Sequence, residues 1–349
     1  MPSDFENLCA FETLYAAHCA ARRGKRHKSD VIRFEADLAN QLWTLKTDLE
    51  SGRYTVGGYK RFVINDPKTR EIQALSYADR VVQHALCDKV LAPFFEKRLI
   101  YDNCACRVGK GTGFGVARLS AFLREHYRRY GARGWILKAD VRQYFPSIDH
   151  AVLLSRLRRH IPDPRIMALL ETIIDSFHGA PGKGLPMGNQ TSQWFALYYL
   201  DPIDRLVKEQ RRVPHYTRYM DDMVLLSPDK ADLQECLRQM REKCRAELRL
   251  ELNQKTQIFP LENGVDYLGW HFYLTPQGKV VRALRTAAKQ RLKRRLKKLQ
   301  YAYAMGELDI PDIKCRVAAG NGHLKRGHTW HLRKRLYGKT VFQRRAARQ

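Results

Sequence analysis

Apolar residues recur at helical spacing along much of the chain. One amphipathic helix is marked by Leu38, Leu42, Leu45 and Leu49, and Ser51-Gly52 follows it as a stop signal. The same periodicity predicts further helices over 77–98, around 116–123, and over 150–160, 164–177, 191–208, 231–248 and 285–303. The pattern therefore predicts a chain of many helices separated by short connecting segments.

Short apolar runs between these helices predict strands. A hairpin is expected over 54–74, because Asn65-Asp66-Pro67 supplies the residues of a turn. A second hairpin is expected from two apolar runs, 215–219 and 223–226, that flank the tight turn Met220-Asp221-Asp222. Further short strands are predicted over 135–137, 251–259 and 267–273.

The charge of the chain is strongly unbalanced. Lys and Arg number 63 against 36 Asp and Glu, which gives a formal net charge of +27. An excess of this size predicts a polyanionic partner, most simply nucleic acid. The alternative is a solvated basic surface that keeps the protein soluble.

Several other classes of protein are disfavoured by the composition. No apolar run is long enough to span a bilayer, and the acidic start of the chain lacks the regions of a signal peptide. We therefore expect a cytoplasmic protein that does not associate with membranes. The eight cysteines are scattered, with Cys104-x-Cys106 as the one close pair, so we expect free thiols, mostly buried, rather than a structural zinc site.

Three carboxylates stand at the ends of apolar strands. Asp140 follows one predicted strand, and Asp221 and Asp222 lie in the turn between two others. The simple explanation is turn chemistry, in which Asp is favoured. Other aspartates are expected to be structural or capping residues, namely Asp149, Asp201 and Asp204. Acids that meet at strand ends need a counter-charge, and Mg²⁺ bound by carboxylates and substrate phosphates supplies one.

The motifs around these acids resemble those of reverse transcriptases. Tyr219-Met220-Asp221-Asp222 is similar to their YxDD box, and the run 138–149, KADVRQYFPSID, resembles their first palm motif. Leu252-Asn253-Gln254-Lys255-Thr256 resembles the motif that carries a lysine, and Tyr267-Leu268-Gly269-Trp270 resembles the primer grip. Their order and spacing also fit, so the resemblance implies an RNA-directed DNA polymerase.

The same resemblance implies the α+β fold of a right-hand polymerase. Fingers with an N-terminal extension would occupy 1–138, and a palm built on an antiparallel sheet would occupy 139–280, with a fingers insertion at about 153–180. A basic helical thumb would occupy 281–349. The helix predicted there carries a Leu292, Leu296, Leu299, Tyr303 stripe. It is expected to pack that stripe inside and turn its charge toward phosphates, with a calmodulin-target or membrane-surface helix as the alternative.

For catalysis, the resemblance implies two Mg²⁺ ions, with Mn²⁺ as an alternative. Asp140 and Asp221 would bridge the metals, the backbone carbonyl of Val141 would add a ligand, and Asp222 would lie more peripherally. Lys255 would protonate the departing pyrophosphate; the alternative for this residue is an ordinary surface lysine.

The resemblance also implies residues that bind nucleotide and template. Phe145 occupies the position of the aromatic gate that excludes a ribose 2′-OH, and its alternative is a core aromatic. Arg70 would hold the triphosphate or template, although exposed arginines are common. Gly188 would allow close approach to the backbone. Ser192 and Gln193 would touch the template or the nucleotide pocket, with a helix cap as the alternative for Ser192.

One motif resembles a particular group of bacterial and phage reverse transcriptases. Group II intron and retroviral enzymes usually read QGxxxSP before the YxDD box, whereas this chain reads Met187-Gly188-Asn189-Gln190-Thr191-Ser192-Gln193. That is similar to the GxxxSQ form of enzymes from diversity-generating retroelements, which carry Ile, Leu or Val where Met187 stands. The resemblance implies a structured template RNA, a cDNA product, dNTPs and a small basic oligomeric accessory protein as partners. It also implies misincorporation opposite template adenines.

Two other functions compete with diversification. One is antiphage defence, in which a reverse transcriptase makes DNA from its own noncoding RNA; gene neighbourhood would distinguish the two. The other is an RNA-binding scaffold on an inactive polymerase fold, against which the intact set of acids argues.

Overall fold

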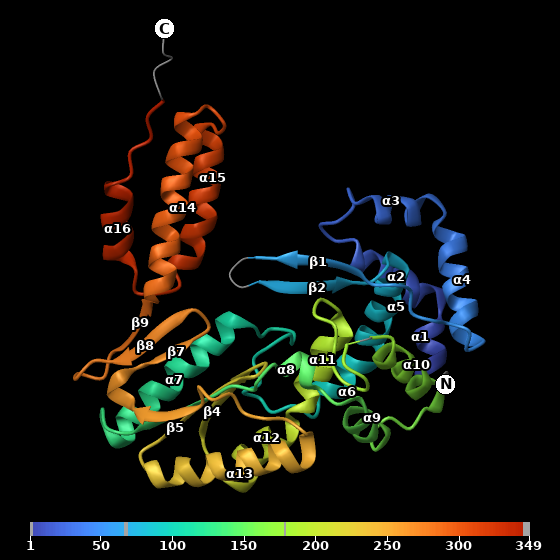
Figure 1. Ribbon diagram of the computed structural model, residues 1–349, viewed down its shortest axis with the longest axis horizontal. Helices are drawn as coiled ribbons and strands as arrows, with labels where there is room; N and C mark the ends of the chain where they lie inside the picture. The colour runs from blue at the N-terminus through green and yellow to red at the C-terminus, as the bar shows by residue number, and fades with distance from the viewer. Residues whose placement is uncertain (1–2, 66–68, 178, 345–349) are drawn as a thin grey trace. The chain divides into compact units, whose positions relative to one another are not determined.

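The computed structural model describes residues 3–65, 69–177 and 179–344, and the chain divides into two compact units (Figure 1). The first unit takes in the chain up to Gly111 and then 139–224 and 234–256. The second takes in 112–138, 225–233 and the chain from Gln257 onward. Each unit is described by itself below.

Helices dominate the first unit, and most of the predicted ones are present. The leucine stripe forms α4, which buries Leu42, Leu45 and Leu49 and has Ser51 as its C-cap. Within this unit α2 packs on α4 and α5. The helices are α1 (Asp4–Cys9), α2 (Phe11–Ala21), α3 (Ser29–Ala36), α4 (Leu38–Glu50), α5 (Tyr77–Leu86), the π-helix η1 (Cys87–Leu91), α6 (Ala92–Glu96), α8 (Tyr144–Ser147), α9 (His150–Arg158), α10 (Pro164–Asp175), α11 (Gln190–Tyr199), α12 (Asp201–Arg205), the π-helix η2 (Leu206–Gln210) and most of α13 (Lys230–Leu248).

The helix predicted over 191–208 is interrupted, which corrects the prediction. α11 ends at Tyr199, and α12 begins two residues later with Pro202 in its first turn. Proline has no N–H for the α-helical ladder and is tolerated only in a first turn, so the chain starts a new helix there. α11 is the most buried helix of the unit, and Phe95 packs on its Trp194 and Tyr198 rings at 5.9 and 4.9 Å between centroids.

Two hairpins belong to the first unit or begin in it. β1 (Lys60–Ile64) and β2 (Arg70–Ala74) pair antiparallel, with Lys60 opposite Ala74. Of their predicted turn, Asp66 and Pro67 lie outside the described residues. β4 (His215–Tyr219) and β5 (Asp222–Ser227) are neighbouring strands joined through Met220 and Asp221. Asp222, predicted to lie in the turn, is the first residue of β5.

The second unit combines antiparallel strands with helices. α7 (Thr112–Tyr130) is the first helix of this unit, and β3 (Trp135–Ala139) pairs antiparallel with β6 (Gln257–Pro260). β7 (Val265–Tyr267), β8 (Trp270–Leu274) and β9 (Val280–Leu284) form a three-stranded antiparallel sheet. The 3₁₀ turn η3 (Leu261–Asn263) precedes this sheet.

Two strand predictions are corrected in this region. The strand predicted over 251–259 is reduced to β6, because 251–256 folds as a loop with a single bridge at Leu252. The strand predicted over 267–273 is a hairpin, since Leu268 and Gly269 adopt positive φ angles of 48° and 87° between β7 and β8. β9 was not predicted.

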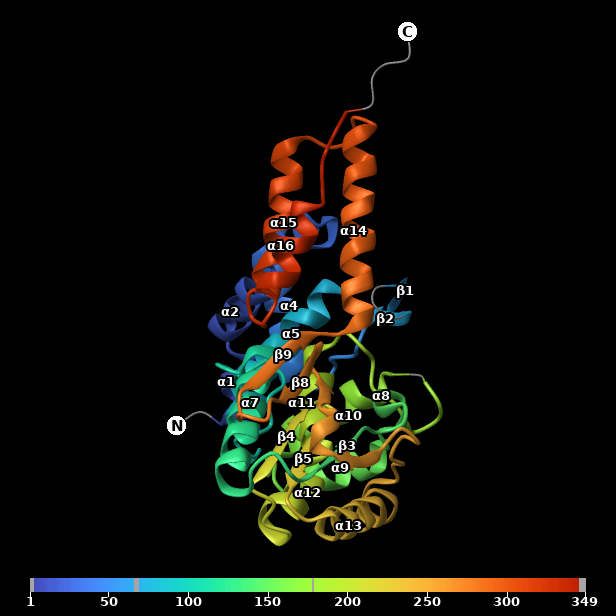
Figure 2. The same cartoon turned by 90° about the vertical axis from the view of Figure 1, so that its left-hand side faces the viewer.

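Three helices end the second unit: α14 (Thr286–Ala304), α15 (Ile310–Leu324) and α16 (Trp330–Gly338). They lie side by side in two perpendicular views (Figure 1, Figure 2). α14 buries Leu296 and Leu299, whereas Lys297 and Lys298 beside them are exposed. The burial of these two leucines, with Leu292 and Tyr303 half-buried, agrees with the expectation that the stripe packs inside.

Two findings on the described residues bear on the expectations from composition. Among them, no helix combines the length and apolar character that a membrane crossing requires. All eight cysteines are described as free thiols, and five of them are buried: Cys9, Cys87, Cys104, Cys236 and Cys244.

Candidate active site

The β4–β5 hairpin presents two predicted site residues at its turn. β4 leads to the turn through the buried residues Tyr216, Thr217 and Arg218. Met220 adopts a left-handed conformation with φ of 55°, which is uncommon for a residue with a side chain. Asp221 and Asp222 follow, both half-buried. The buried strand and the left-handed residue together fix where the two acids emerge.

Asp140 is held by a loop more than 100 residues later in the chain. The Asn253 backbone N–H donates to the Asp140 carbonyl at 2.7 Å, and the Asn253 side-chain amide donates to Asp140 Oδ2 at 3.4 Å. The Asp140 N–H donates to Thr256 Oγ1 at 3.4 Å. Asn253 and Thr256 had no assigned role in the sequence, although they lie in the motif that carries Lys255. Their positions, two residues before and one residue after that lysine, could have suggested a role for them.

The acids of the two motifs meet in the first unit. Burial raises the pKa of Asp221 to about 7, and the negative charge of Asp140, a hydrogen bond shared with it, and the charge of Asp222 add to the shift. Such a shift means that the ionised form of Asp221 is disfavoured beside other acids. A cation at this point would reverse the penalty.

The donor atoms at this point suit a hard cation such as Mg²⁺. Within the described residues, no group of three or more His, Cys, Asp or Glu side chains is arranged to hold a metal by itself. Mg²⁺ fits this set, because it is usually bound by one or two carboxylates together with substrate phosphates. Val141 lies opposite Leu252 in an isolated antiparallel bridge. The hydrogen bonds on either side of this bridge are made by its neighbours, the Asp140 carbonyl and the Arg142 N–H. The Val141 carbonyl therefore points away from the Leu252 segment.

Phe145 lies on the short helix α8, just after this site. It is half-buried, whereas Tyr144 beside it is 3% exposed and donates its hydroxyl hydrogen to the Ala196 carbonyl. The two rings lie 5.8 Å apart at 73°. Tyr144 thus packs in the core, and Phe145 keeps part of its ring accessible.

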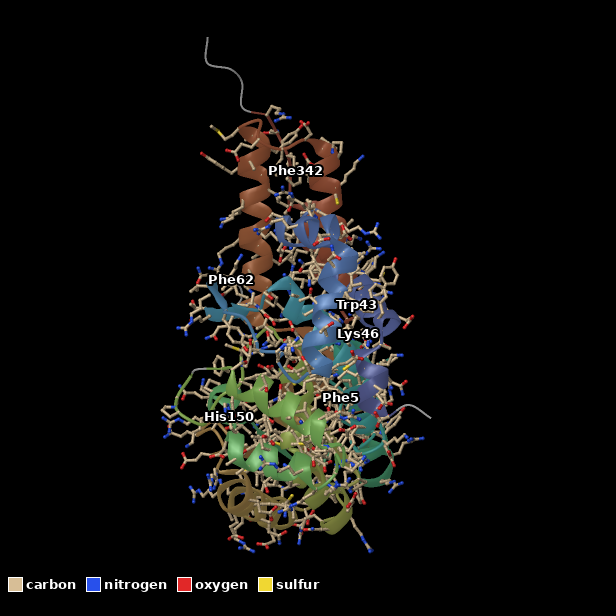
Figure 3. All side chains as sticks on the ribbon, turned by 90° about the vertical axis from the view of Figure 1, so that its right-hand side faces the viewer. Phe5, Trp43, Lys46, Phe62, His150 and Phe342 are labelled. Atoms are coloured by element: carbon tan, nitrogen blue, oxygen red, sulfur yellow. The ribbon has the colours of Figure 1, made fainter. Side chains whose placement is uncertain are left out.

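The β1–β2 hairpin contacts the loop before α11. The Gln73 N–H of β2 donates to the Met187 carbonyl at 3.3 Å. Gly188 has φ of 121°, a conformation that favours glycine, and a Cβ placed there would lie in tight contact with Ile72 Cγ2 at 3.3 Å. Arg70 begins β2 and is exposed. The β1 side chains are exposed too, as Figure 3 shows for Phe62.

Gln193 and Ser192 differ in their exposure to solvent. Ser192 is 1% exposed, so its side chain is buried in the packing around α11 rather than at the surface. The capping alternative for Ser192 is wrong, because the N-cap of α11 is Asn189. Gln193 is half-buried, and the Cys106 thiol donates to its Oε1 at 3.4 Å. That contact leaves the Gln193 amide hydrogens as the donors it can present.

The remaining predicted residues are accessible or structural. Lys255 is exposed, and its backbone N–H donates to Asn253 Oδ1 at 3.1 Å, which ties it to the loop around Asp140. Asp149 caps α9 by accepting from the Val152 N–H at 3.1 Å, as a capping residue should. Asp204 is structural and fully buried against Arg218.

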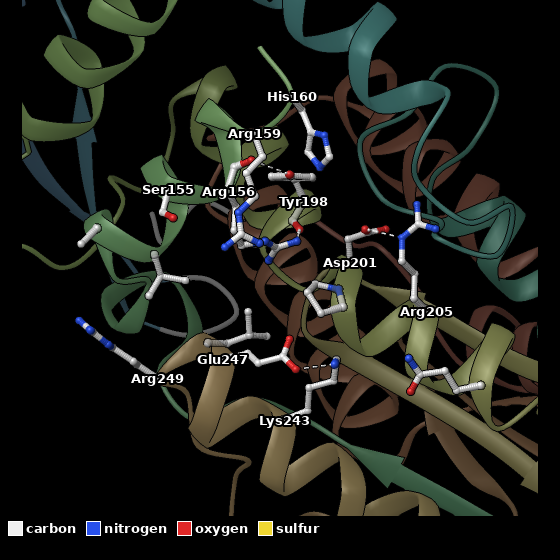
Figure 4. A pocket seen from close by; sticks show the side chains of 15 residues that line it. Ser155, Arg156, Arg159, His160, Tyr198, Asp201, Arg205, Lys243, Glu247 and Arg249 are labelled. Carbon is white, nitrogen blue, oxygen red and sulfur yellow. Dashed lines mark hydrogen bonds and ion pairs between the residues drawn. The ribbon is translucent and has the colours of Figure 1, made fainter. Parts of the chain in front are cut away.

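A cavity of about 640 Å³ elsewhere in the first unit does not contain these residues (Figure 4). It is lined by several cations, but most already have partners. Arg156 donates to the Tyr199 carbonyl at 2.7 Å, Arg205 pairs with Asp201, and Lys243 pairs with Glu247. The cavity is therefore not a better candidate for the active site.

Comparisons with known proteins identify a family and several relatives. The family model described as "Reverse transcriptase (RNA-dependent DNA polymerase)" matches residues 64–272. The chain is 25% identical over 280 residues to Protein YkfC of Escherichia coli, covering 67% of this chain and 72% of that protein. It is 22% identical over 214 residues to the group II intron-encoded protein LtrA of Lactococcus lactis, covering 57% of this chain and 33% of LtrA.

A solved structure of telomerase from Candida albicans, in complex with a fragment of telomeric RNA, is also similar. Its TM-score is 0.49 at 14% identity, and the match covers 71% of this chain and 50% of that one. The chain thus spans a third of LtrA and half of the telomerase chain.

The family match covers more than half of the chain and contains every predicted site residue, from Arg70 to Lys255. It confirms the predictions of a right-hand polymerase fold and of an RNA-directed DNA polymerase. This chain belongs to the reverse transcriptase (RNA-dependent DNA polymerase) family.

Proposed function

We propose that this chain copies a structured template RNA into cDNA by nucleotidyl transfer at a two-metal centre on Asp140 and Asp221. One observation carries the proposal: the half-buried Asp221 carboxyl shares a hydrogen bond with Asp140, and burial with this neighbour raises the pKa of Asp221 to about 7. Keeping two acids together in a buried place costs free energy. A site that retains them gains from binding cations.

Each residue has a separate task in this proposal. Asp140, Asp221 and the Val141 carbonyl would hold the two Mg²⁺ ions, or Mn²⁺ in their place, with Asp222 at the edge of the site. When bound, the ions supply positive charge to the transferring phosphate and its attacking and leaving oxygens. Lys255 donates a proton to the departing pyrophosphate. Its exposed side chain, tied by its backbone to the Asp140 loop, is free to follow the phosphates.

The nucleotide is bound and selected by residues around α8 and α11. The accessible part of the Phe145 ring lies against the sugar and leaves no room for a 2′-OH. Arg70 holds the triphosphate or the template strand, since its guanidinium binds phosphates bidentately. Gly188 lets the substrate approach the backbone, and Gln193 presents its amide N–H groups to an acceptor. The buried Ser192 supports these residues from the core.

The second unit supplies the nucleic-acid grip. In the assignment we propose, 1–138 are the fingers, 139–280 the palm with a fingers insertion near 153–180, and 281–349 the thumb. The exposed cations of α14 are the phosphate-binding surface of the thumb. Their number in one helix fits a contact driven by counterion release.

Neutralising thumb cations should reduce the salt dependence of RNA binding. For Lys297→Gln with Lys298→Gln, we expect the slope of log affinity against log salt to fall by about 1 to 2. Fluorescence anisotropy with a labelled primer–template at several salt concentrations measures the slope. Lys243→Gln is the matched control, because Lys243 already pairs with Glu247 at 2.6 Å. Equal slopes for the thumb variant and the wild type would remove α14 from the binding surface.

We further propose that the chain belongs to the diversity-generating retroelement group. The Gly188-to-Gln193 motif supports this, because it ends in Ser-Gln rather than Ser-Pro. In such a system the enzyme works with a small basic accessory oligomer and misincorporates opposite template adenines.

The spectrum of errors tests the subgroup. Purified protein with its template RNA, dNTPs and Mg²⁺ should make cDNA in a primer-extension assay. Sequencing that cDNA should show substitutions concentrated at template adenines. Errors spread evenly over the four template bases would rule out the diversification role while leaving reverse transcription intact. A complete lack of cDNA would instead reject the polymerase proposal.

A further inference from the structure

A buried arginine connects the core of the first unit to the Asp-Asp turn. Arg218 lies on β4, two residues before Met220, and its side chain is 0% exposed. Its guanidinium Nη1 donates to the Met220 carbonyl at 2.9 Å, and Nη2 donates to the Leu197 carbonyl of α11 at 3.0 Å. One side chain therefore binds the turn and the most buried helix together.

Asp204 holds this arginine in place. Arg218 Nε donates to Asp204 Oδ1 at 2.7 Å, and Nη2 donates to Asp204 Oδ2 at 2.5 Å, which is a bidentate pair. The Tyr216 hydroxyl donates to the same Oδ1 at 2.6 Å. Both partners of the ion pair are fully buried. A guanidinium has a planar, fixed set of donors, so Asp204 determines where Nη1 points.

The Met220 carbonyl is a sensitive point of the site. Met220 is left-handed, a conformation that costs free energy for a residue with a side chain. Its carbonyl belongs to the planar peptide that also contains the Asp221 nitrogen. A contact that holds this oxygen therefore also fixes the orientation of the peptide plane that leads into Asp221.

We propose that Arg218 is a positioning residue for the reaction: held by Asp204, it locks the Met220 peptide and so orients Asp221. The inference rests on the proposed function of Asp221. It gives the buried Arg218–Asp204 pair a task beyond stability. Arg218 is fully buried, and four of its five N–H groups bind Asp204, Leu197 and Met220, so it acts through these contacts rather than on the substrate.

The first test is Arg218→Lys, with Tyr216→Phe as the matched control. An ammonium keeps the charge beside Asp204 but cannot reproduce the fork that spans Asp204, Leu197 and Met220. Tyr216→Phe removes a hydrogen bond from the same carboxylate without touching the turn. We expect kcat of Arg218→Lys to fall about tenfold or more, with KM for dNTP nearly unchanged. Tyr216→Phe should lower the thermal midpoint and leave kcat near the wild-type value.

A second variant excludes a simple loss of folding. Arg218→Met combined with Asp204→Asn removes both charges, so no unpaired charge stays buried. The side-chain amide oxygen that replaces the carboxylate at position 204 can still accept a hydrogen bond from Tyr216. This variant should fold and show a kcat at least as low as that of Arg218→Lys. Either variant should also increase amide hydrogen exchange at 220–223 about tenfold, beyond any change in the Tyr216→Phe control.

The outcomes separate this inference from the proposed function. Wild-type protein that makes no cDNA rejects the proposed function. Active wild type whose Arg218 variants lose kcat only as much as Tyr216→Phe, with equal exchange at the turn, overturns the positioning role. Loss of kcat with selective exchange at the turn supports it.

Discussion

Asp221→Asn is expected to abolish cDNA synthesis and at the same time to stabilise the metal-free protein above pH 7. The activity should fall about 10³-fold or more, because a metal-bridging carboxylate is replaced by a neutral amide. The gain in stability follows from the same carboxylate. In the metal-free state it is a charge held beside Asp140 with its pKa raised to about 7.

The pH dependence of this gain has a defined sign. The ordinary pKa of Asp is 3.8, so between about pH 4 and 7 the folded state retains a proton on Asp221 that the unfolded state releases. The stability of the wild type therefore falls as the pH rises through this window and stays low above it. Asn carries no such proton, so the variant should be more stable than the wild type by about 1–3 kcal/mol at pH 8. The difference should shrink toward pH 5.

Thermal unfolding in a chelating buffer at pH 5, 6.5 and 8 measures the effect, and primer extension measures the activity. Glu262→Gln is the control, because it neutralises one exposed carboxylate that lies outside the sequence motifs of the acids. Added Mg²⁺ should raise the wild-type midpoint more than that of Asp221→Asn. A variant that still makes cDNA at a tenth of the wild-type rate, or that is less stable at pH 8, would contradict the assignment of Asp221.

Phe145→Ala is expected to admit ribonucleotides. If the accessible part of the Phe145 ring fills the space of a ribose 2′-OH, removing it should reduce the preference for dNTP over rNTP roughly 10- to 100-fold. Single-nucleotide incorporation gives kcat/KM for each matched pair of dNTP and rNTP, and their ratio is the discrimination. The rate with dNTP should change much less than the ratio.

Tyr144→Phe is the matched control for this change. Tyr144 is the adjacent aromatic, but it is buried and its hydroxyl donates to the Ala196 carbonyl. Losing that hydroxyl should reduce the thermal midpoint and leave sugar discrimination at the wild-type value. If Phe145→Ala keeps the wild-type ratio, the aromatic belongs to the core and the gate lies elsewhere.

Much of the fold was predictable because its elements have local causes. The leucine stripe of α4, the strands around the Asp-Asp turn and the basic helix α14 each follow from residues that are neighbours in the sequence. The failures also have local causes that periodicity does not detect. Pro202 divides the helix predicted over 191–208, and the left-handed Leu268 turns one predicted strand into a hairpin.

The chemistry of this protein can be read from short stretches of its chain: which acids form its motifs, the basic excess, and the family to which they point. These are properties of contiguous residues, and a motif of contiguous residues keeps its identity in any fold. How the acids are held depends instead on tertiary contacts. Asn253 contacts Asp140 across 113 residues, and Arg218 reaches Asp204 and Leu197 through side chains that the backbone pattern does not place. Such contacts arise only when the whole unit packs and excludes water, because buried polar groups must then find partners within it.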